Sequence, residues 1–356
     1  MLDYLNLKPQ AFGLDISDFS LKIIKLEKRG GLMALASFGE KTIKPGIIEE
    51  GEIKDGEALT EILREACKEV QGKRLNTKYV VASLPEERAF LQVIQMPKMK
   101  EDELKKAIRF EAENYVPLPI DNVYLDSQIV TPIVNHLDHL DALITALPQK
   151  TVDPYVTVLK RSGLKPLVLE MESQAISRAL IAGGATTKSV LLIDMGASNT
   201  RLSIFAGHSL RFTSSIAFAC RKLTETIAEA LKISFQQAEK LKIQEGLDGQ
   251  EILKPILTEL AATIEKHLEY YQGYAAHEHL PSTGKEIEKI ILSGGGANLK
   301  GLSEFLSARL KLPVELGNPW INIMPSPIKE VPELPYSESL RYTTALGLAL
   351  QGLKYD

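Results

Sequence analysis

Two aspartates occupy the same short pattern, at the end of an apolar run and before a turn of small or polar residues. Asp15 follows AFGL and precedes the turn SDFS, and Asp194 follows VLLI and precedes the turn GASN. A carboxylate at such a place can hold a magnesium ion through water, while the backbone N–H groups of the turn bind phosphate oxygens. The pattern therefore indicates a site for magnesium and phosphate.

The pattern is an internal repeat. When residues 13–26 are set above residues 192–205, Asp15 aligns with Asp194 and Lys22 aligns with Arg201. A single aspartate before a turn can simply cap its own backbone, which is the alternative interpretation of either copy alone. The repetition favours the phosphate-binding interpretation, because two such hairpins facing each other would enclose a nucleotide tail in a cleft.

A glycine-rich loop supplies a third element. The segment 293–296, SGGG, follows an apolar run and precedes a predicted helix. Glycine lets a flat ligand approach the backbone, and the N-terminus of a helix favours anions. The loop is a candidate for the adenosine side of the same site.

Strand and helix patterns explain how these residues would be positioned. The periodicity predicts a hairpin from residue 11, a strand over 32–38 and a helix over about 57–71 closed by Gly72. Cys67 and Val70 are predicted on the buried face of that helix. The second half repeats the three-strand opening, with helices at about 220–231, 234–244 and 250–279, and a helix over 340–353 closes the chain.

Residues 78–165 are predicted to form a compact α+β unit of their own. The stretch KEDELKKAIRFEAENYV reads as a helix with Leu104, Ile108 and Tyr115 on one face, and it ends before Pro117. His136 and His139 are expected in a solvated hairpin or loop rather than at a metal, and His277 and His279 at the end of a long helix, where histidine suits the helix dipole. Core packing or a contact between the lobes is expected for Tyr270, Tyr271 and Tyr274.

Composition narrows the class of protein. A chain of 356 residues with 44% apolar residues suits two domains or one duplicated domain. The formal charge of −4 shows no basic stripe, so nucleic acid is not an expected partner. We expect no direct membrane insertion, because the apolar runs are short, and a reducing cytoplasm, because the two cysteines lie far apart in the sequence.

Several segments together resemble a known family. The chain is similar to the superfamily of actin, heat-shock chaperones and sugar kinases, and within it to the type IV pilus assembly family PilM, a relative of the cell-division protein FtsA. The segments that carry the resemblance are MPKMKEDELKKAIRFEAENYVPLPID at 96–121, VLEMES around Glu172, AEKLK at 238–242, ILSGGGANLKGL at 291–302 and ALGLAL at 345–350.

The resemblance implies an α/β fold: an actin-like two-lobed fold of duplicated βββαβα, ribonuclease H-like units, with an inserted α+β subdomain called 1C. The implied divisions are 1–77 for the first part of subdomain 1A, 78–165 for the inserted 1C, 166–185 for the continuation of 1A, 186–339 for the second lobe with a helical 2B at about 220–285, and 340–356 for a closing helix that returns to 1A.

The resemblance also implies site residues. Asp15 and Asp194 would hold Mg²⁺ through water, and Glu172, in the helix that joins the lobes, is a further candidate. Two departures from the family pattern are Ser17 in place of a glycine and Ala219-Cys220 in place of a glycine pair. The implied nucleotide-binding residues are Asp15, Ser17, Ser20, Lys22, Gly196, Ser198, Asn199, Thr200, Glu239, Lys242, Gly294, Gly295 and Asn298.

The implied function is that of a cytoplasmic scaffold that binds ATP with Mg²⁺ and has at most slow ATPase activity. Its implied partner is the cytoplasmic N-terminal tail of the inner-membrane protein PilN, held between subdomains 1A and 1C, so the scaffold would be peripheral to the inner membrane through a partner. Other pilus assembly proteins and self-association are further expected contacts. No catalytic residue is assigned.

Two other functions remain open from the sequence. An FtsA-like filament protein shares the fold, but this chain is expected to lack the amphipathic helix with which that family ends, since it closes on QGLKYD. A small-molecule kinase of the superfamily would need a catalytic acid or base over a substrate pocket in the first lobe, where the 78–165 segment resembles PilM instead.

Overall fold

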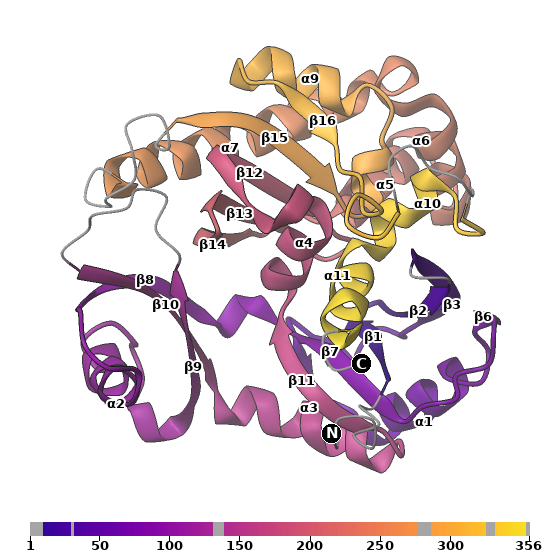
Figure 1. Cartoon of the computed structure of the whole chain (residues 1–356). Helices are drawn as coiled ribbons and strands as arrows, with labels where there is room; N and C mark the ends of the chain where they lie inside the picture. Colours follow the sequence, from indigo (N-terminus) through magenta and orange to yellow (C-terminus); the bar gives the residue numbers. More distant parts are fainter. Residues whose placement is uncertain (1–9, 30–31, 131–138, 276–285, 325–331, 354–356) are drawn as a thin grey trace.

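Two β-sheets form the two halves of the protein (Figure 1). The computed structural model describes residues 10–29, 32–130, 139–275, 286–324 and 332–353. Each sheet begins with a meander of three antiparallel strands, and a later strand of the same sheet pairs parallel with the first. The duplicated three-strand opening that the aspartate repeat predicts is therefore present in both halves.

The first sheet has six strands in the order β11-β7-β1-β2-β3-β6. Its central strand β1 is buried along its whole length, as expected for a strand covered on both faces. A two-stranded ribbon, β4 (Ile48–Glu49) with β5 (Glu52–Ile53), leads into helix α1. The strands are β1 (Ala11–Ile16), β2 (Ser20–Arg29), β3 (Leu32–Thr42), β6 (Gln71–Gly72), β7 (Tyr79–Leu84) and β11 (Lys165–Met171).

The second sheet has five strands in the order β14-β13-β12-β15-β16, which matches the order β3-β2-β1-β7-β11 of the first. Its helices are α5 (Cys220–Leu231), α6 (Phe235–Gly249), α7 (Lys254–Ala275) and α9 (Leu302–Leu310). The strands are β12 (Thr186–Met195), β13 (Thr200–Gly207), β14 (Ser209–Ile216), β15 (Ile287–Ser293) and β16 (Val314–Leu316).

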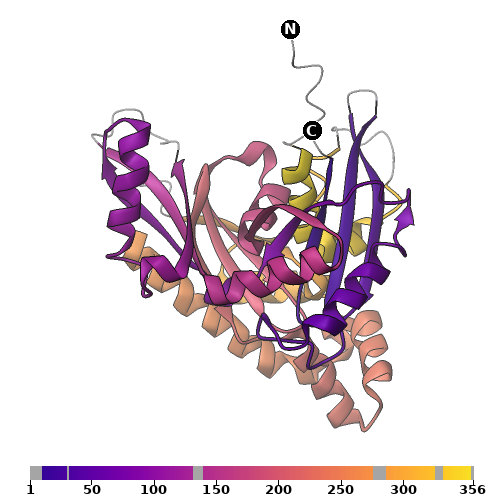
Figure 2. The ribbon, with the colours of Figure 1, turned by 90° about the horizontal axis from the view of Figure 1, so that it is seen from below.

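A third, three-stranded sheet lies within residues 78–165. Its order is β8-β10-β9, and helix α2 (Glu101–Ala112) packs on it through Leu104 and Ile108. Figure 2 shows this unit on the opposite side of the molecule from α1 (Gly56–Ala66). The strands are β8 (Phe90–Pro97), β9 (Val123–Val130) and β10 (His139–Pro148), and helix α3 (Gln149–Arg161) returns the chain to the first sheet.

Two helices pack against each other between the large sheets. Helix α4 (Glu172–Leu180) touches strands of both sheets, and α11 (Thr343–Gly352) lies across α4 and β1. Two short helices precede α11, namely α10 (Tyr336–Ser339) and a 3₁₀ turn at Leu340–Tyr342. None of the helices in the described ranges is long and apolar enough to cross a bilayer.

The predicted end of the first helix is wrong. Helix α1 ends at Ala66, so Val70 lies outside it and Cys67 is its half-buried C-cap. Gly72 does not cap a helix but pairs with Ser37 at the edge of the first sheet. Glycine suits this position for two reasons. Its φ is +80°, and a Cβ would lie 2.5 Å from the Ala36 carbonyl oxygen.

Two aromatic predictions are also wrong. Tyr115 is exposed, because α2 ends at Ala112 and the chain then turns Val116 into the core instead. Tyr270 is exposed on α7, whereas its neighbour Tyr271 is fully buried. His139 lies on β10 with its Nε2 3.5 Å from Asp141 Oδ1, and the other histidines singled out above, His136, His277 and His279, lie outside the described residues.

The contact between α4 and α11 generates a stability prediction. A Cβ at Gly347 would lie 1.9 Å from the Ala175 carbonyl oxygen, so Gly347→Ala must push the two helices apart. We expect a loss of about 1–3 kcal/mol in the free energy of unfolding, measured by urea denaturation. Gly273→Ala is the matched control on α7, where nothing lies near the new Cβ, and it should gain about 0.5–1 kcal/mol. Equal stability of both variants would contradict the close packing.

Candidate functional site

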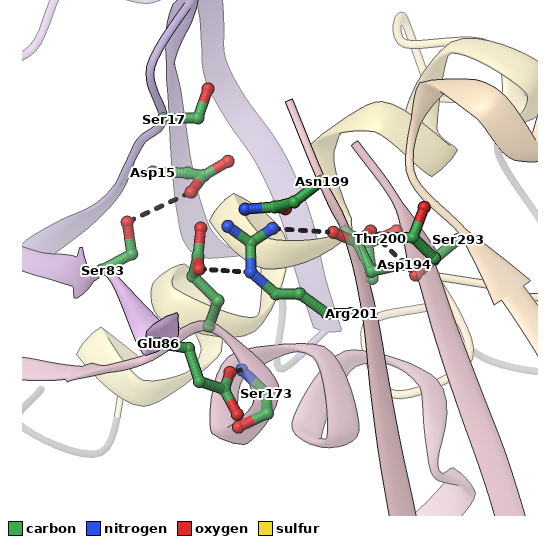
Figure 3. Close-up of polar contacts among 12 residues, drawn as sticks. Asp15, Ser17, Ser83, Glu86, Ser173, Asp194, Asn199, Thr200, Arg201 and Ser293 are labelled. Carbon is green, nitrogen blue, oxygen red and sulfur yellow. Dashed lines mark hydrogen bonds and ion pairs between the residues drawn. The ribbon is translucent and has the colours of Figure 1, made fainter. Parts of the chain in front are cut away.

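Asp15 and Asp194 occupy equivalent places in the two sheets (Figure 3). Each lies near the carboxyl end of a buried strand, and a serine from the neighbouring parallel strand donates a hydrogen bond to it. Ser83 Oγ lies 3.1 Å from Asp15 Oδ1, and Ser293 Oγ lies 3.0 Å from Asp194 Oδ1. The two halves therefore fix their aspartates by the same contact.

The turns after the two aspartates are alike in their backbone. The N–H of Ser17 donates to the Ser20 carbonyl over 2.9 Å, and the N–H of Gly196 donates to the Asn199 carbonyl over 3.0 Å. Ser17 also donates its hydroxyl to the Ser20 carbonyl over 2.9 Å. Ser17, where the resemblance implies a glycine, thus directs its side chain back onto its own hairpin.

The remaining hairpin residues are engaged within the site or beside it. Lys22 Nζ donates to Ser20 Oγ over 2.8 Å and lies 3.9 Å from Asp15 Oδ2. Thr200 donates its hydroxyl to the Phe218 carbonyl over 2.9 Å. Ser198 lines a cavity of about 560 Å³ that extends from the two hairpin turns to the end of β14, together with Asp18, Glu50, residues 86–89, Asn199, residues 213–215 and Ala217.

Arg201 is the residue at which charges from both halves meet. It is 8% exposed, although it carries a permanent positive charge. Its Nε lies 2.6 Å from Glu172 Oε2, its Nη2 3.3 Å from Glu87 Oε1 and its Nη1 3.5 Å from Asp194 Oδ2. These three carboxylates come from α4, from the 3₁₀ turn after β7 and from β12.

Glu87 has a second contact with the other half. Asn199 Nδ2 donates a hydrogen bond to Glu87 Oε1, the same oxygen that faces Arg201. The neighbouring Glu86 accepts a hydrogen bond from the backbone N–H of Ser173 over 3.0 Å. The 3₁₀ turn Glu86–Arg88 therefore holds the start of α4 with one glutamate and the second hairpin with the other.

Burial perturbs the acidic side chains of this cluster. It raises the pKa of Asp194, of Glu86 and of Asp18, and it raises that of Glu172 well above its ordinary value. Burial opposes the charge of Arg201, yet the adjacent carboxylates raise its pKa. Several buried acids share one guanidinium, so a single positive charge offsets the negative charges of more than one carboxylate. Ionisation of these acids in the buried cluster is therefore unfavourable.

The glycine-rich loop lies against the second hairpin. Gly294 has a φ of +81°, and a Cβ there would lie 2.6 Å from the Met195 carbonyl oxygen. A Cβ at Gly296 would lie 2.1 Å from Cys220 Sγ, so the cysteine that replaces a family glycine fills the space beside this loop. Asn298 Nδ2 donates to the Ser337 carbonyl over 2.8 Å. Gly295 shares the 3₁₀ turn Gly295–Asn298 with it.

Glu239 and Lys242 form a small cluster of their own on α6. Lys242 Nζ lies 2.8 Å from Glu239 Oε2 and donates to Thr224 Oγ1 over 2.7 Å. Both charges act on the buried thiol of Cys220, whose pKa burial raises to about 12. The structure therefore brings Asp15, Lys22 and Asp194 into one cluster, and Glu239 and Lys242 into a second cluster near the glycine-rich loop. The ligand roles of these residues stay predictions.

Sequence reasoning missed several residues of the first cluster. It did not select Ser83, Glu86 or Glu87 as site residues. It named Ser293 only as the start of the glycine-rich loop, and Arg201 only as the counterpart of Lys22 in the repeat. For the two serines and the two glutamates, the available signal was a position at or just after the carboxyl end of the strand beside each aspartate strand, because the carboxyl ends of parallel neighbours meet at one edge of a sheet.

The cluster as it stands does not fit a magnesium ion. Magnesium needs oxygen ligands and several waters in near-octahedral geometry. Oδ1 of each aspartate already accepts a serine hydroxyl, and Oδ2 of Asp194 faces the guanidinium of Arg201. Within the described part of the chain, no group of three His, Cys, Asp or Glu side chains is arranged to hold a metal. These contacts disfavour direct coordination of magnesium by the carboxylates, and the site that holds magnesium through water stays a prediction.

Comparison with known proteins identifies the family. A family model described as type IV pilus assembly protein PilM matches residues 13–353. The chain belongs to the PilM family. A solved structure of a PilM-PilN type IV pilus biogenesis complex matches it with a TM-score of 0.80 and 28% identity, over 97% of this chain and 99% of that one. The membership favours the PilM-like interpretation over the FtsA-like and kinase alternatives.

More distant matches agree with the fold. MreB 5 of Spiroplasma citri bound to AMPPNP has a TM-score of 0.55 and 12% identity over 98% of both chains. FtsA of Pseudomonas aeruginosa is 24% identical over 273 residues, which are 67% of this chain and 57% of FtsA. The chain thus spans about half the length of the FtsA relatives it matches. The predicted actin-like fold is confirmed.

The raised pKa of Glu172 predicts how a PilM-like site responds to pH. Between its unfolded value of 4.5 and its higher folded value, the native state binds more protons than the unfolded state. The stability that Glu172 contributes is therefore present at low pH and is lost as the pH rises through the folded pKa. Glu172→Gln removes this dependence, because glutamine stays neutral.

We expect the free energy of unfolding of the wild type, measured relative to Glu172→Gln, to fall as the pH rises from about 5 through the raised pKa of Glu172. Urea denaturation of both proteins at each pH measures the difference. A difference that rises with pH would show that the ion pair with Arg201, rather than burial, governs the ionisation of Glu172.

Proposed function

We propose that this protein is an actin-like scaffold of type IV pilus assembly, which binds ATP between its lobes and the cytoplasmic N-terminal tail of a PilN-like inner-membrane protein. The observation that carries the proposal is family membership over residues 13–353, together with the match to the PilM-PilN complex. Such a protein works at the cytoplasmic face of the inner membrane, and it is held there by its partner.

The two hairpins and the glycine-rich loop support nucleotide binding. The first hairpin turn places Lys22 beside Ser20 and Asp15, and the loop approaches the second hairpin through Gly294. ATP in this proposal is a structural ligand that favours one arrangement of the lobes, and its hydrolysis is at most slow. We propose binding of the nucleotide and do not include direct coordination of Mg²⁺ by the carboxylates, because the cluster does not fit a metal while Arg201 is in place.

Exposed apolar side chains on the inserted unit support binding of a partner. Phe110 is 72% exposed, and Tyr115, Leu118, Tyr124 and Ile129 are exposed as well. Leu118 lines a cavity of about 510 Å³ with Glu113, Val116, Pro117, Pro119, Ile120 and Asp121. An extended peptide needs little more than an apolar groove and backbone partners. We place the tail between the first lobe and this insert, with Leu118 in contact.

The subdomain boundaries belong to the same proposal. We assign 1–77 with 166–185 to subdomain 1A, 78–165 to 1C, 186–339 to the second lobe and 340–356 to the closing segment, whose helix α11 packs on 1A. Within 78–165, β7 and α3 belong to the first sheet and its core, so we assign these two elements to 1A as well. Contacts with other pilus assembly proteins and self-association are also proposed, as extensions of the scaffold role.

Nucleotide binding is tested by thermal unfolding with and without ATP. At an ATP concentration of about 100 times Kd, binding should stabilise the folded wild type by about 2.7 kcal/mol. Asp15→Ala and Asp194→Ala should lose most of this gain, each compared with its own melting temperature without ATP. Asp248→Ala, an exposed aspartate on α6, is the matched control and should keep it. Unchanged stabilisation in both site variants would refute the site.

Partner binding is tested by calorimetry with a synthetic N-terminal tail of the PilN-like protein. The tail should bind the wild type, and a scrambled peptide should not. Leu118→Asp should weaken binding by about tenfold, since it places a charge at an apolar contact. Ile243→Asp, at a more exposed apolar position on α6, should bind as the wild type does. If neither the tail nor its extended forms bind folded protein, the proposed partner is wrong.

A further inference from the structure

Three carboxylates from separate elements converge on the guanidinium of Arg201. Glu172 begins α4, Glu87 lies in the turn after β7, and Asp194 lies near the end of β12. Their oxygens are 2.6, 3.3 and 3.5 Å from three different nitrogens of the same group. A bound divalent cation also gathers carboxylate oxygens from several elements, but here the oxygens are spread around a guanidinium, and a side chain supplies the positive charge.

The guanidinium also lies beside the second hairpin turn, where the sequence predicts the cation. A Cβ added to Gly196 would lie 3.9 Å from Arg201 Nη1. Arg201 pairs with Asp194 in the hairpin register, just as Lys22 pairs with Asp15. Lys22 lies 3.9 Å from the aspartate of its own hairpin, whereas Arg201 also reaches Glu172 and Glu87 in the other half.

A divalent ion cannot join this arrangement without displacing Arg201. The ion would compete for the same oxygens, and it would stand next to a buried positive charge that repels it. Arg201 cannot lose its proton to make room, because a guanidinium stays charged in proteins. Movement of the side chain is the remaining way to free the carboxylates.

We propose that Arg201 is the built-in counterion of this carboxylate cluster and occupies the place of a divalent cation. The cluster formed by Arg201, Glu172, Glu87 and Asp194 is therefore complete without a metal and holds the two halves together by itself. Removal of the guanidinium leaves the buried carboxylates of Glu172 and Asp194 and the more exposed carboxylate of Glu87 facing one space, which Mg²⁺ can then enter. This inference goes beyond nucleotide binding and does not depend on it.

The test measures the melting temperature against Mg²⁺ concentration without nucleotide. The wild type should not respond to Mg²⁺ or to EDTA. Arg201→Ala should melt lower than the wild type in EDTA and should then gain about 2–5 °C at a Mg²⁺ concentration of about 100 times its Kd. Arg201→Lys, which keeps a positive charge, should behave as the wild type.

Arg211→Ala is the matched control. Arg211 is a buried arginine of the adjacent strand β14, with Nη1 3.6 Å from Asp141 Oδ2, and its loss leaves one carboxylate rather than three. This variant should be destabilised without a response to Mg²⁺. Arg201→Gln, closer in size, repeats the test if Arg201→Ala does not fold in EDTA, and recovery of folded Arg201→Ala on addition of Mg²⁺ would itself support the proposal.

Two results would overturn the proposal. One is a wild type that is stabilised by Mg²⁺ alone as strongly as Arg201→Ala is. The other is a folded Arg201→Ala or Arg201→Gln protein whose melting temperature does not rise with Mg²⁺. None of the Mg²⁺ experiments contains ATP. A negative result in them therefore leaves the test of ATP binding unaffected, and a negative result with ATP leaves the Mg²⁺ test unaffected.

Discussion

A buried guanidinium shared by carboxylates of both halves is the interaction on which the rest of the site depends. Arg201 belongs to the second half, while Glu87 and Glu172 precede that half in the chain. Buried acids without a counter-charge are strongly unfavourable, and so is a buried arginine without acids. Each group therefore requires the others, and the ion pairs fix how β13 meets α4 and the turn after β7.

The two sheets reach this arrangement through the same strand order. In each, the aspartate strand lies beside a parallel strand that supplies a serine to the carboxylate, Ser83 in one half and Ser293 in the other. The equivalence ends at the residue that pairs with the aspartate in the hairpin. Lysine stays near its own hairpin and arginine extends across, so a duplicated fold has produced an asymmetric site.

The fold was predictable to the extent that local patterns control it. The paired aspartates, the three-strand openings and most helices follow from periodicity and turn residues. The prediction failed at Gly72, where pairing with Ser37 at a sheet edge overrides the helix signal, and at Tyr115, where the end of α2 changes which residue faces the core. Both errors arise where long-range packing decides the end of an element.

The sequence by itself determined the repeat of Asp15 and Asp194, the class of fold and the family, because these are carried by short segments and their order. Only the tertiary structure decided what Arg201 does. Glu87 lies 114 residues away from it in the chain, and Glu172 belongs to a helix that no local pattern connects to β13. Charges so distant in sequence become neighbours only when the two sheets and α4 pack together, since electrostatic pairing depends on separation in space.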